Sequence, residues 1–332
     1  MINFAVIGAG RIGRIHAANV AESPACHIHS IVDPFPEAAT ALATALNAKV
    51  STVEDVLADP EIHAVVICTP TDTHCDLIER SSRAGKAIFC EKPVDLDISR
   101  ARDCAATVRE TGVVFALGFN RRYDPTFNSL KQRIADGAIG ATEQVIITSR
   151  DPSPPPAEYV KQSGGLFRDM MIHDLDMACW LLGEKPVEVY ATGSCLVDPA
   201  IGEAGDIDSA MVILKTASGK ICHINNSRRS VYGYDQRIEV FGSEGMVQAG
   251  NHKPSEVTVS NHQGVSQDQP EHFFLERYRQ AYKIELQNFI DALLSQEGDG
   301  KQLLTNIDDG INALELADAC VASMTTGKRI TL

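Results

Sequence analysis

The first 120 residues alternate short apolar runs with helical patterns, and this alternation limits the possible folds more than any other feature of the chain. The apolar runs are INFAVIG, HIHSIVD, AVVICTP, AIFCEKP and VVFALGFN, and the helical patterns between them are RIHAANVAE, PEAATALATAL, DLIERSSRAG and ISRARDCAATVRETG. Adjacent parallel strands need a long crossover, which a helix supplies. The pattern therefore predicts a parallel sheet with helices on both faces, over residues 1–120.

The turn after the first apolar run reads GAGRIG, with Gly8, Gly10 and Gly13 in G-x-G-x-x-G spacing. This spacing allows a tight turn, a close approach to a pyrophosphate, and packing of the next helix on the strand. Asp33 ends the second apolar run, where a carboxylate accepts hydrogen bonds from the adenine ribose and repels a 2′-phosphate. The sequence therefore predicts a Rossmann domain that binds NAD in preference to NADP.

The later apolar runs end in CTPTDTH and CEKP, at the carboxyl edge of the predicted sheet, where ligands of such folds bind. Lys92 directly follows a buried strand and precedes Pro93, so it is well placed to reach a substrate oxygen. Ordinary loop or capping roles remain equally open for His74 and Glu91. The expected cofactor-binding residues are Gly8, Gly10, Arg11, Ile12, Gly13, Asp33, Thr69, Pro70, His74, Glu91 and Lys92.

Beyond residue 120 the pattern changes to that of an α+β domain, residues 121–332. After a connecting helix, DPTFNSLKQRIADGAIG, alternating strands dominate, with hairpin signals such as ASGK and GSEG. This predicts a large, open and mostly antiparallel sheet that binds substrate and pairs subunits. Two helical patterns and the short strand RITL close the chain, and in an alternative arrangement the final helix and strand pack back on the first domain.

The composition narrows the functional classes. With 30 basic and 44 acidic residues, the formal charge of -14 argues against nucleic acid and anionic membranes as partners. No apolar run has the length of a membrane span, and MINFAVIGAG lacks a basic leader, so we expect a cytoplasmic protein. The nine cysteines form no C-x-x-C pair and several lie in apolar strands, so no metal site is predicted.

The stretch GGLFRDMMIHDLD, residues 164–176, predicts one helix with Asp169 and His173 four residues apart. Met171, Ile172, Leu175, Cys179 and Leu182 form its core-facing stripe, and Asp169, His173 and Asp176 lie along the border of that stripe. Taken alone, the pair has two interpretations. Asp169 and His173 either make local hydrogen bonds and complement the helix dipole, or they form a functional acid–base pair.

GAGRIG, TPTDTH, CEKP, GFNRRYDP and GGLFRDMMIHDLD together resemble the family of glucose-fructose oxidoreductases and inositol dehydrogenases, over nearly the whole chain. SRDPSPPPAEY and SRRSVYGYDQRIEVFGSEG narrow the resemblance to the inositol dehydrogenases within it. The resemblance implies that Lys92, Asp169 and His173 meet at the nicotinamide as the catalytic set and that the protein is a homotetramer. It also implies a polyol substrate, for which the candidate binding residues are Asn120, Arg122, Asp151, Tyr232 and Tyr234.

Three functions follow from these expectations. The first is NAD-dependent oxidation of myo-inositol to its 2-keto derivative, with His173 as general base. The second is the same chemistry on another inositol or a sugar, such as scyllo-inositol, D-chiro-inositol or glucose. The third is a non-catalytic NAD-binding sensor, against which the presence of Lys92, Asp169 and His173 argues.

Overall fold

The computed structural model describes residues 1–295 and 303–332, and it divides into two compact units. The first unit is Met1–Tyr123 with Ala281–Ile311, and the second is Asp124–Gln280 with Asn312–Leu332. The sequence analysis places everything after residue 120 in the second domain, and the structure differs from this for 281–311. Segments far apart in the chain share a core here, which local sequence patterns do not reveal.

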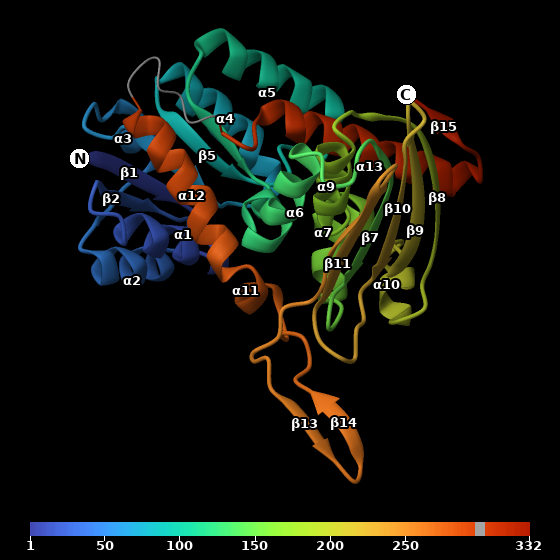
Figure 1. The fold of residues 1–332 in the computed structure, drawn as a ribbon. Coiled ribbons are helices and arrows are strands. Elements are labelled where there is room, and N and C mark those ends of the chain that lie inside the picture. Colours follow the sequence, from blue (N-terminus) through green and yellow to red (C-terminus); the bar gives the residue numbers. More distant parts are fainter. Residues whose placement is uncertain (296–302) are drawn as a thin grey trace. The chain divides into compact units, whose positions relative to one another are not determined.

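The first unit contains a six-stranded parallel sheet in the order β3-β2-β1-β4-β5-β6 (Figure 1). This is the strand order of a dinucleotide-binding fold, so the predicted α/β class is confirmed. The strands are β1 (Ile2–Ile7), β2 (Cys26–Val32), β3 (Lys49–Val50), β4 (Ala64–Ile67), β5 (Ala87–Glu91) and β6 (Phe115–Gly118). The sequence analysis missed β3, whose two residues are too few to show a periodic pattern.

Helices cover the sheet of the first unit. They are α1 (Arg11–Ala21), α2 (Pro36–Leu46), α3 (Val53–Ala58), α4 (His74–Arg83), α5 (Ile98–Thr111) and α12 (Arg279–Leu294), with short 3₁₀ turns η1 (Thr71–Thr73) and η2 (Asn120–Tyr123). The six-residue α3 was also missed, although a capping box between Thr52 and Asp55 begins it. From α12, Leu286, Phe289 and Ile290 enter the same core as the inward side chains of the sheet. This packing makes α12 part of the first unit.

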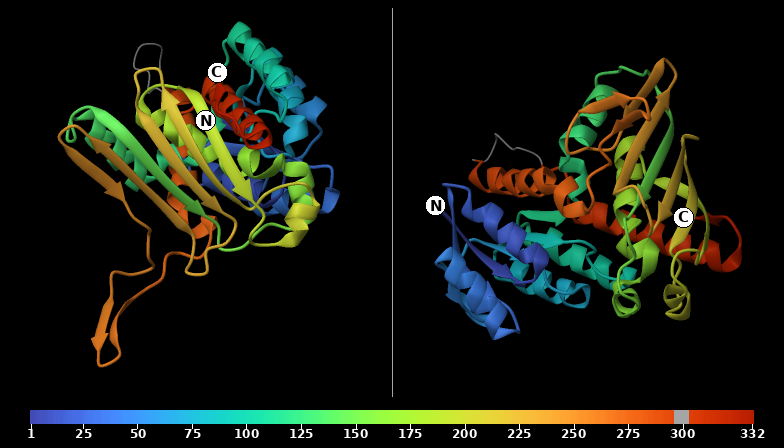
Figure 2. Two further views of the ribbon diagram at one scale, coloured as in Figure 1. Left: turned by 90° about the vertical axis from the view of Figure 1, so that its right-hand side faces the viewer. Right: turned by 90° about the horizontal axis from the view of Figure 1, so that it is seen from below.

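The second unit contains a seven-stranded sheet in the order β12-β11-β7-β10-β9-β8-β15. Strands of this sheet lie side by side in the left view of Figure 2. Its strands are β7 (Thr142–Arg150), β8 (Pro186–Ser194), β9 (Ser209–Thr216), β10 (Ile221–Ser227), β11 (Asp235–Gly242), β12 (Gly245–Ala249) and β15 (Ile330–Thr331). Among the described strands of this sheet, β7 and β10 pair in parallel and the other neighbours are antiparallel. The predicted large, mostly antiparallel sheet is therefore confirmed.

One face of this sheet is buried and the other is exposed. In β9, Ala210, Val212 and Leu214 are buried, whereas Met211 and Ile213 between them are about half exposed. The helices of this unit are α6 (Pro125–Ala135), α7 (Ala157–Ser163), α8 (Gly165–Asp169), α9 (Ile172–Leu182), α10 (Pro199–Glu203), α11 (Phe274–Arg277) and most of α13 (Ile307–Thr326). Among them, α9 packs against β7 and β10.

The final helix and strand join the second unit for most of their length. Residues up to Ile311 of α13 belong to the first unit, but β15 pairs with β8. The segment SEVTVSN does not join the large sheet: β13 (Thr258–Asn261) pairs with β14 (Gly264–Gln267) in a separate exposed hairpin (Figure 1). Across the described residues, none of the helices combines the length and apolarity needed to cross a membrane.

Candidate functional site

The glycine turn between β1 and α1 has the geometry expected of a phosphate cradle. Gly8 has φ +104°, and a Cβ there would lie 2.5 Å from the carbonyl oxygen of Cys68. A Cβ on Gly13 would lie 1.9 Å from the carbonyl oxygen of Gly8, so both positions require glycine. A Cβ on Gly10 would meet no atom within 4 Å, which leaves open space at the start of α1. The residues present fit a bound dinucleotide.

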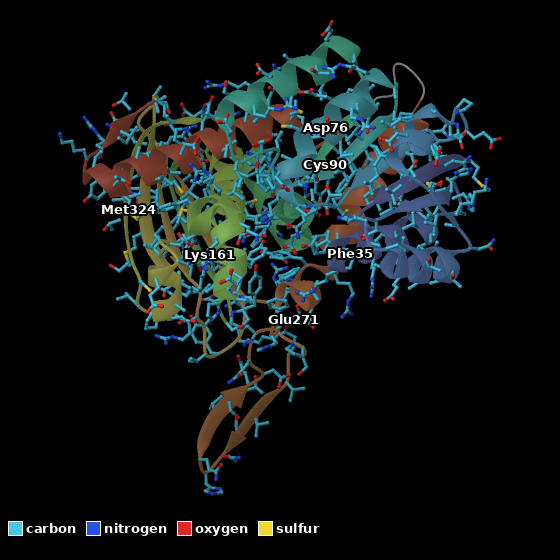
Figure 3. All side chains as sticks on the ribbon, turned by 180° about the vertical axis from the view of Figure 1, so that it is seen from behind. Phe35, Asp76, Cys90, Lys161, Glu271 and Met324 are labelled. Carbon is cyan, nitrogen blue, oxygen red and sulfur yellow. The ribbon has the colours of Figure 1, made fainter. Side chains whose placement is uncertain are left out.

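Asp33 is tied to this turn. One carboxylate oxygen accepts a hydrogen bond from the backbone N–H of Ala9 at 2.7 Å, and the other accepts from that of Phe35 at 2.8 Å. The acidic group expected to contact the adenine ribose is therefore held at the end of β2. Phe35 itself is 73 % exposed (Figure 3). Of the other predicted turn residues, Arg11 is exposed and Ile12 is half-buried.

His74 connects two of the loops at the carboxyl edge of the sheet. Its Nδ1 lies 2.7 Å from the carbonyl oxygen of Pro93, and its Nε2 lies 2.9 Å from that of Thr69. Burial lowers the pKa of His74, so the ring is neutral and donates to one of these oxygens. His74 therefore connects the Thr69–Pro70 loop to the Lys92–Pro93 loop. The Lys92–Pro93 peptide bond is cis.

Glu91 belongs to a buried cluster that sequence reasoning missed. Its Oε1 lies 2.7 Å from Nε2 of His16, which is 4.0 Å from Oε1 of Glu285. His16 and Glu285 have no exposed surface, and neither carboxylate oxygen of Glu285 has a hydrogen-bond partner among the described residues. Burial raises the pKa of Glu285 well above its usual range, and the negative charge of Glu91 adds a smaller increase. Glu91 directly precedes Lys92, which is half-buried.

Asn120 and Arg122, two predicted substrate residues, lie in η2 and are buried. The guanidinium of Arg122 donates to the carbonyl oxygen of Leu304 at 2.7 Å and to the carboxylate of Asp309 at 2.9 Å. These bonds connect η2 to Leu304 and to the first turn of α13, within the first unit. They give Arg122 a structural function that its sequence position does not indicate.

The prediction of one helix over residues 164–176 is wrong, because two helices meet there in an irregular turn. The backbone N–H groups of Met170 and Met171 both donate to the carbonyl oxygen of Leu166, at 3.1 and 2.9 Å. In a regular α-helix, Met171 would donate to Phe167 instead. Asp169 therefore ends α8, and His173 lies one residue inside α9. Asp176 was expected at the border of the apolar stripe but is 1 % exposed.

Asp169 has two partners that sequence reasoning missed. The hydroxyl of Tyr159 donates to its Oδ1 at 3.0 Å, and Nη2 of Arg228 lies 3.5 Å from its Oδ2. Partial burial and the charge of Asp169 raise the pKa of Tyr159, which keeps that hydroxyl protonated. No spacing signal could have identified these partners, because Tyr159 and Arg228 come from α7 and from the end of β10. These contacts within the second unit hold Asp169, and the side chains of both Asp169 and His173 are half-buried.

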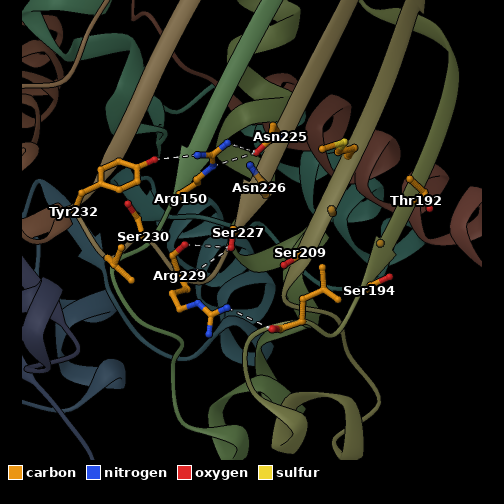
Figure 4. Close-up of a pocket in the computed structure, with 15 residues that line it drawn as sticks. Arg150, Thr192, Ser194, Ser209, Asn225, Asn226, Ser227, Arg229, Ser230 and Tyr232 are labelled. Carbon is orange, nitrogen blue, oxygen red and sulfur yellow. Dashed lines mark hydrogen bonds between the residues drawn. The ribbon is translucent and has the colours of Figure 1, made fainter.

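Tyr232 lies in the loop between β10 and β11, and it contacts Arg150 at the end of β7. Its hydroxyl donates to Asp235 at 2.6 Å and accepts from Arg150 at 2.9 Å. Tyr232 also lines a pocket of about 530 Å³ within the second unit (Figure 4). Asp169 and His173 do not line that pocket.

Tyr234 and Asp151, the two other predicted substrate residues of the second unit, each donate a backbone hydrogen bond. Tyr234 is buried, and its ring packs edge-on against Tyr278 with a centroid distance of 5.9 Å. Its N–H donates to the carbonyl oxygen of Glu271 at 2.9 Å. Asp151 is half-buried and donates its backbone N–H to Ser227 at 3.0 Å.

Comparison with known proteins agrees with this geometry. Residues 2–119 match the model of an oxidoreductase family with an NAD-binding Rossmann fold, and residues 127–248 match the GFO/IDH/MocA C-terminal domain. An inositol 2-dehydrogenase of Rhizobium meliloti is 50 % identical over 331 residues, covering 100 % of this chain and 99 % of that protein. The chain belongs to the GFO/IDH/MocA oxidoreductase family.

Two solved structures extend the comparison. A myo-inositol dehydrogenase from Corynebacterium glutamicum is 44 % identical with a TM-score of 0.94, and covers 100 % of this chain and 99 % of its own. A scyllo-inositol dehydrogenase from Lactobacillus casei, solved with NAD(H) and scyllo-inositol bound, is 27 % identical with a TM-score of 0.92 and the same coverage. NAD binding by this family agrees with the glycine turn of the first unit, in which Gly10 faces open space and Asp33 is held at the end of β2.

Proposed function

We propose that this protein is an NAD-dependent inositol 2-dehydrogenase that oxidises myo-inositol to 2-keto-myo-inositol. The observation that carries the proposal is Asp169, held by Tyr159 and Arg228 and followed four residues later by His173, in a chain half identical to an inositol 2-dehydrogenase. A protein that only sensed NAD would have no use for a base positioned in this way.

The cofactor, when bound, accepts a hydride from the alcohol carbon. Gly8, Gly10, Arg11, Ile12 and Gly13 would hold its pyrophosphate at the start of α1. Asp33 would accept hydrogen bonds from the adenine ribose and exclude a 2′-phosphate. Thr69 and Pro70, with the loop fixed by His74 and the strand end at Glu91, would line the remainder of the cofactor site.

Three side chains carry the proposed chemistry. His173 removes the hydroxyl proton, since a neutral imidazole is an effective base near neutral pH. Asp169 orients the ring and stabilises the imidazolium that forms. Lys92 holds the hydroxyl oxygen and stabilises negative charge that develops on it.

The hydroxyls that do not react need fixed hydrogen-bond partners. We propose Asp151, Tyr232, Tyr234 and Asn120 for this purpose, because each can bond an alcohol and polar groups left unpaired would reject the wrong isomer. Arg122, which is bonded to Leu304 and Asp309, is the weakest member of the predicted set. Tyr232 is the next weakest, because its hydroxyl is already bonded to Asp235 and Arg150.

The test is formation of NADH, followed at 340 nm, with NAD and a panel of myo-inositol, scyllo-inositol, D-chiro-inositol and D-glucose. We expect the highest kcat/KM with myo-inositol. Higher kcat/KM with scyllo-inositol would assign the protein the substrate bound in the Lactobacillus casei enzyme. No NADH from any of the four would overturn the proposal.

We also propose that the enzyme is a cytoplasmic homotetramer. Its nine cysteines are all free thiols, which suits a reducing compartment. The exposed face of the seven-stranded sheet carries large apolar side chains, among them Tyr190, Met211 and Ile213. A second copy of the chain would cover them.

A further inference from the structure

Arg228 is the largest fully buried side chain of the described residues, with 1 % of its surface exposed. Its Nη2 lies 3.5 Å from Oδ2 of Asp169 and 3.8 Å from Oδ2 of Asp206. Neither Nε nor Nη2 makes a hydrogen bond to another described residue. A buried cation is costly unless a nearby anion compensates for it, so the two carboxylates stabilise this position.

The backbone of Arg228 is fixed. It directly follows β10, and its N–H donates to the carbonyl oxygen of Asp208 at 2.8 Å. Asp208 is itself buried and accepts from the backbone N–H groups of Leu196, Val197 and Asp198 at 2.7 to 3.0 Å. The guanidinium is therefore anchored on the sheet, independently of α8.

The two carboxylates that face Arg228 lie at opposite ends of α8. Asp206 accepts from the backbone N–H of Leu166 with both oxygens, at 3.2 and 3.0 Å, and so fixes the start of the helix. A Cβ on Gly165 would lie 2.7 Å from Asp206, which explains the glycine there. Asp169 is the last residue of α8. Arg228 thus connects both ends of this short helix to the sheet.

The two oxygens of Asp169 have different partners. Oδ1 accepts from the hydroxyl of Tyr159, and Oδ2 faces Arg228. A carboxylate held at both oxygens cannot rotate freely, so the orientation of the Asp169 side chain is set before substrate binds.

We propose that Arg228 is a positioning residue for Asp169 in the alcohol oxidation. This inference rests on the proposed function, because it assumes that Asp169 supports His173 as the base. Replacing Arg228 removes the cation that faces Oδ2 and releases the end of α8. The base then spends less time in the reactive orientation, while the NAD cradle of the first unit is unchanged.

The experiment is a double-mutant cycle on kcat with NAD and myo-inositol. The variants are Arg228→Met, Asp169→Asn and the double variant, with Arg229→Met as the matched control because Arg229 is the exposed neighbour. We expect Asp169→Asn to lower kcat roughly 10²-fold and Arg228→Met to lower it about 10- to 100-fold. Because Arg228 acts through Asp169, the double variant should be no slower than Asp169→Asn.

Binding and folding are measured on the same proteins. The Kd for NAD and the thermal midpoint of Arg229→Met should match those of the wild type, and the Kd for NAD of Arg228→Met should stay within about twofold. If Arg228→Met does not fold, Arg228→Lys takes its place in the cycle. The lysine keeps the charge but not the forked geometry, so it should retain more of kcat than methionine would.

The outcomes distinguish failure of the positioning role of Arg228 from failure of the proposed function of Asp169 and His173. If the losses of Arg228→Met and Asp169→Asn multiply in the double variant, Arg228 does not act through Asp169 and the inference is overturned. It is also overturned if Asp169→Asn is slow while Arg228→Met and Arg228→Lys keep wild-type kcat. If Asp169→Asn itself keeps wild-type turnover, the proposed function of the Asp169–His173 pair fails instead.

Discussion

At the scale of single residues, His173 is the side chain on which the proposed reaction depends most. It lies at the start of α9, directly after the turn that ends with Met171, and is half-buried. A half-buried ring is partly shielded from bulk water and partly exposed. A general base needs a fixed position and access to the substrate, and we expect His173 to have both.

We predict that His173→Ala lowers kcat for myo-inositol oxidation roughly 10²- to 10⁴-fold, the loss expected for a removed general base. The Kd for NAD should be nearly unchanged, because the glycine turn and Asp33 lie in the first unit. Steady-state kinetics and NAD titration check both expectations. His262→Ala, in the exposed hairpin, is the control. Wild-type turnover by His173→Ala would mean that another group removes the proton.

Residues whose function follows from local chemistry could be predicted from the sequence. Gly8, Gly13 and Asp33 could be recognised because a tight turn and a ribose contact demand those residue types at fixed spacing. Arg228 and Glu285 could not be predicted. Their importance comes from burial and from partners far along the chain, and an isolated arginine or glutamate in a sequence indicates neither.

At the scale of elements, the parallel strands and most helices follow from periodicity, whereas the turn between α8 and α9 does not. A helix with one irregular turn has nearly the same apolar pattern as a regular one, so Met170 and Met171 gave no signal. The sequence pattern also did not indicate that α12 packs in the first unit. Its apolar face fits either core, and the contact of Phe289 with Phe4, at a centroid distance of 6.2 Å, decides it.

The packing of α12 against α1 and β5 leads to a prediction about pH. Because burial raises the pKa of Glu285 in the folded state, the folded protein holds a proton that the unfolded chain releases above about pH 4.5. The contribution of Glu285 to the free energy of unfolding should therefore be largest at low pH and decrease as the pH rises. Each pH unit between its unfolded and folded pKa contributes about 1.4 kcal/mol.

Glu285→Gln keeps the shape of the neutral acid and should remove this loss. Denaturant unfolding between pH 4.5 and 8 should show that the variant gains stability relative to the wild type as the pH rises. Glu110→Gln, on the exposed side of α5, should follow the wild type. A constant difference between Glu285→Gln and wild type across this range would show that Glu285 is ionised in the folded protein.

At the scale of the whole molecule, the exposed face of the seven-stranded sheet is the feature that a single chain leaves unexplained. Tyr190 pairs with Ile213, Ile213 with His223, and His223 with Ile146, which forms one row across four strands. Tyr190, Ile213 and Ile146 in this row are 44 %, 51 % and 39 % exposed. Contiguous exposed apolar surface of this kind marks an interaction site.

We predict that Ile213→Lys breaks the proposed tetramer into smaller species. The lysine would place a charge at the centre of this face, and a charge buried without a partner weakens an interface. Light scattering coupled to size exclusion should give four times 35.9 kDa for the wild type and less for the variant. Val50→Lys, at a position equally exposed on β3 of the first unit, should remain tetrameric. A tetrameric Ile213→Lys would move the interface away from this face, and a monomeric wild type would contradict the tetramer itself.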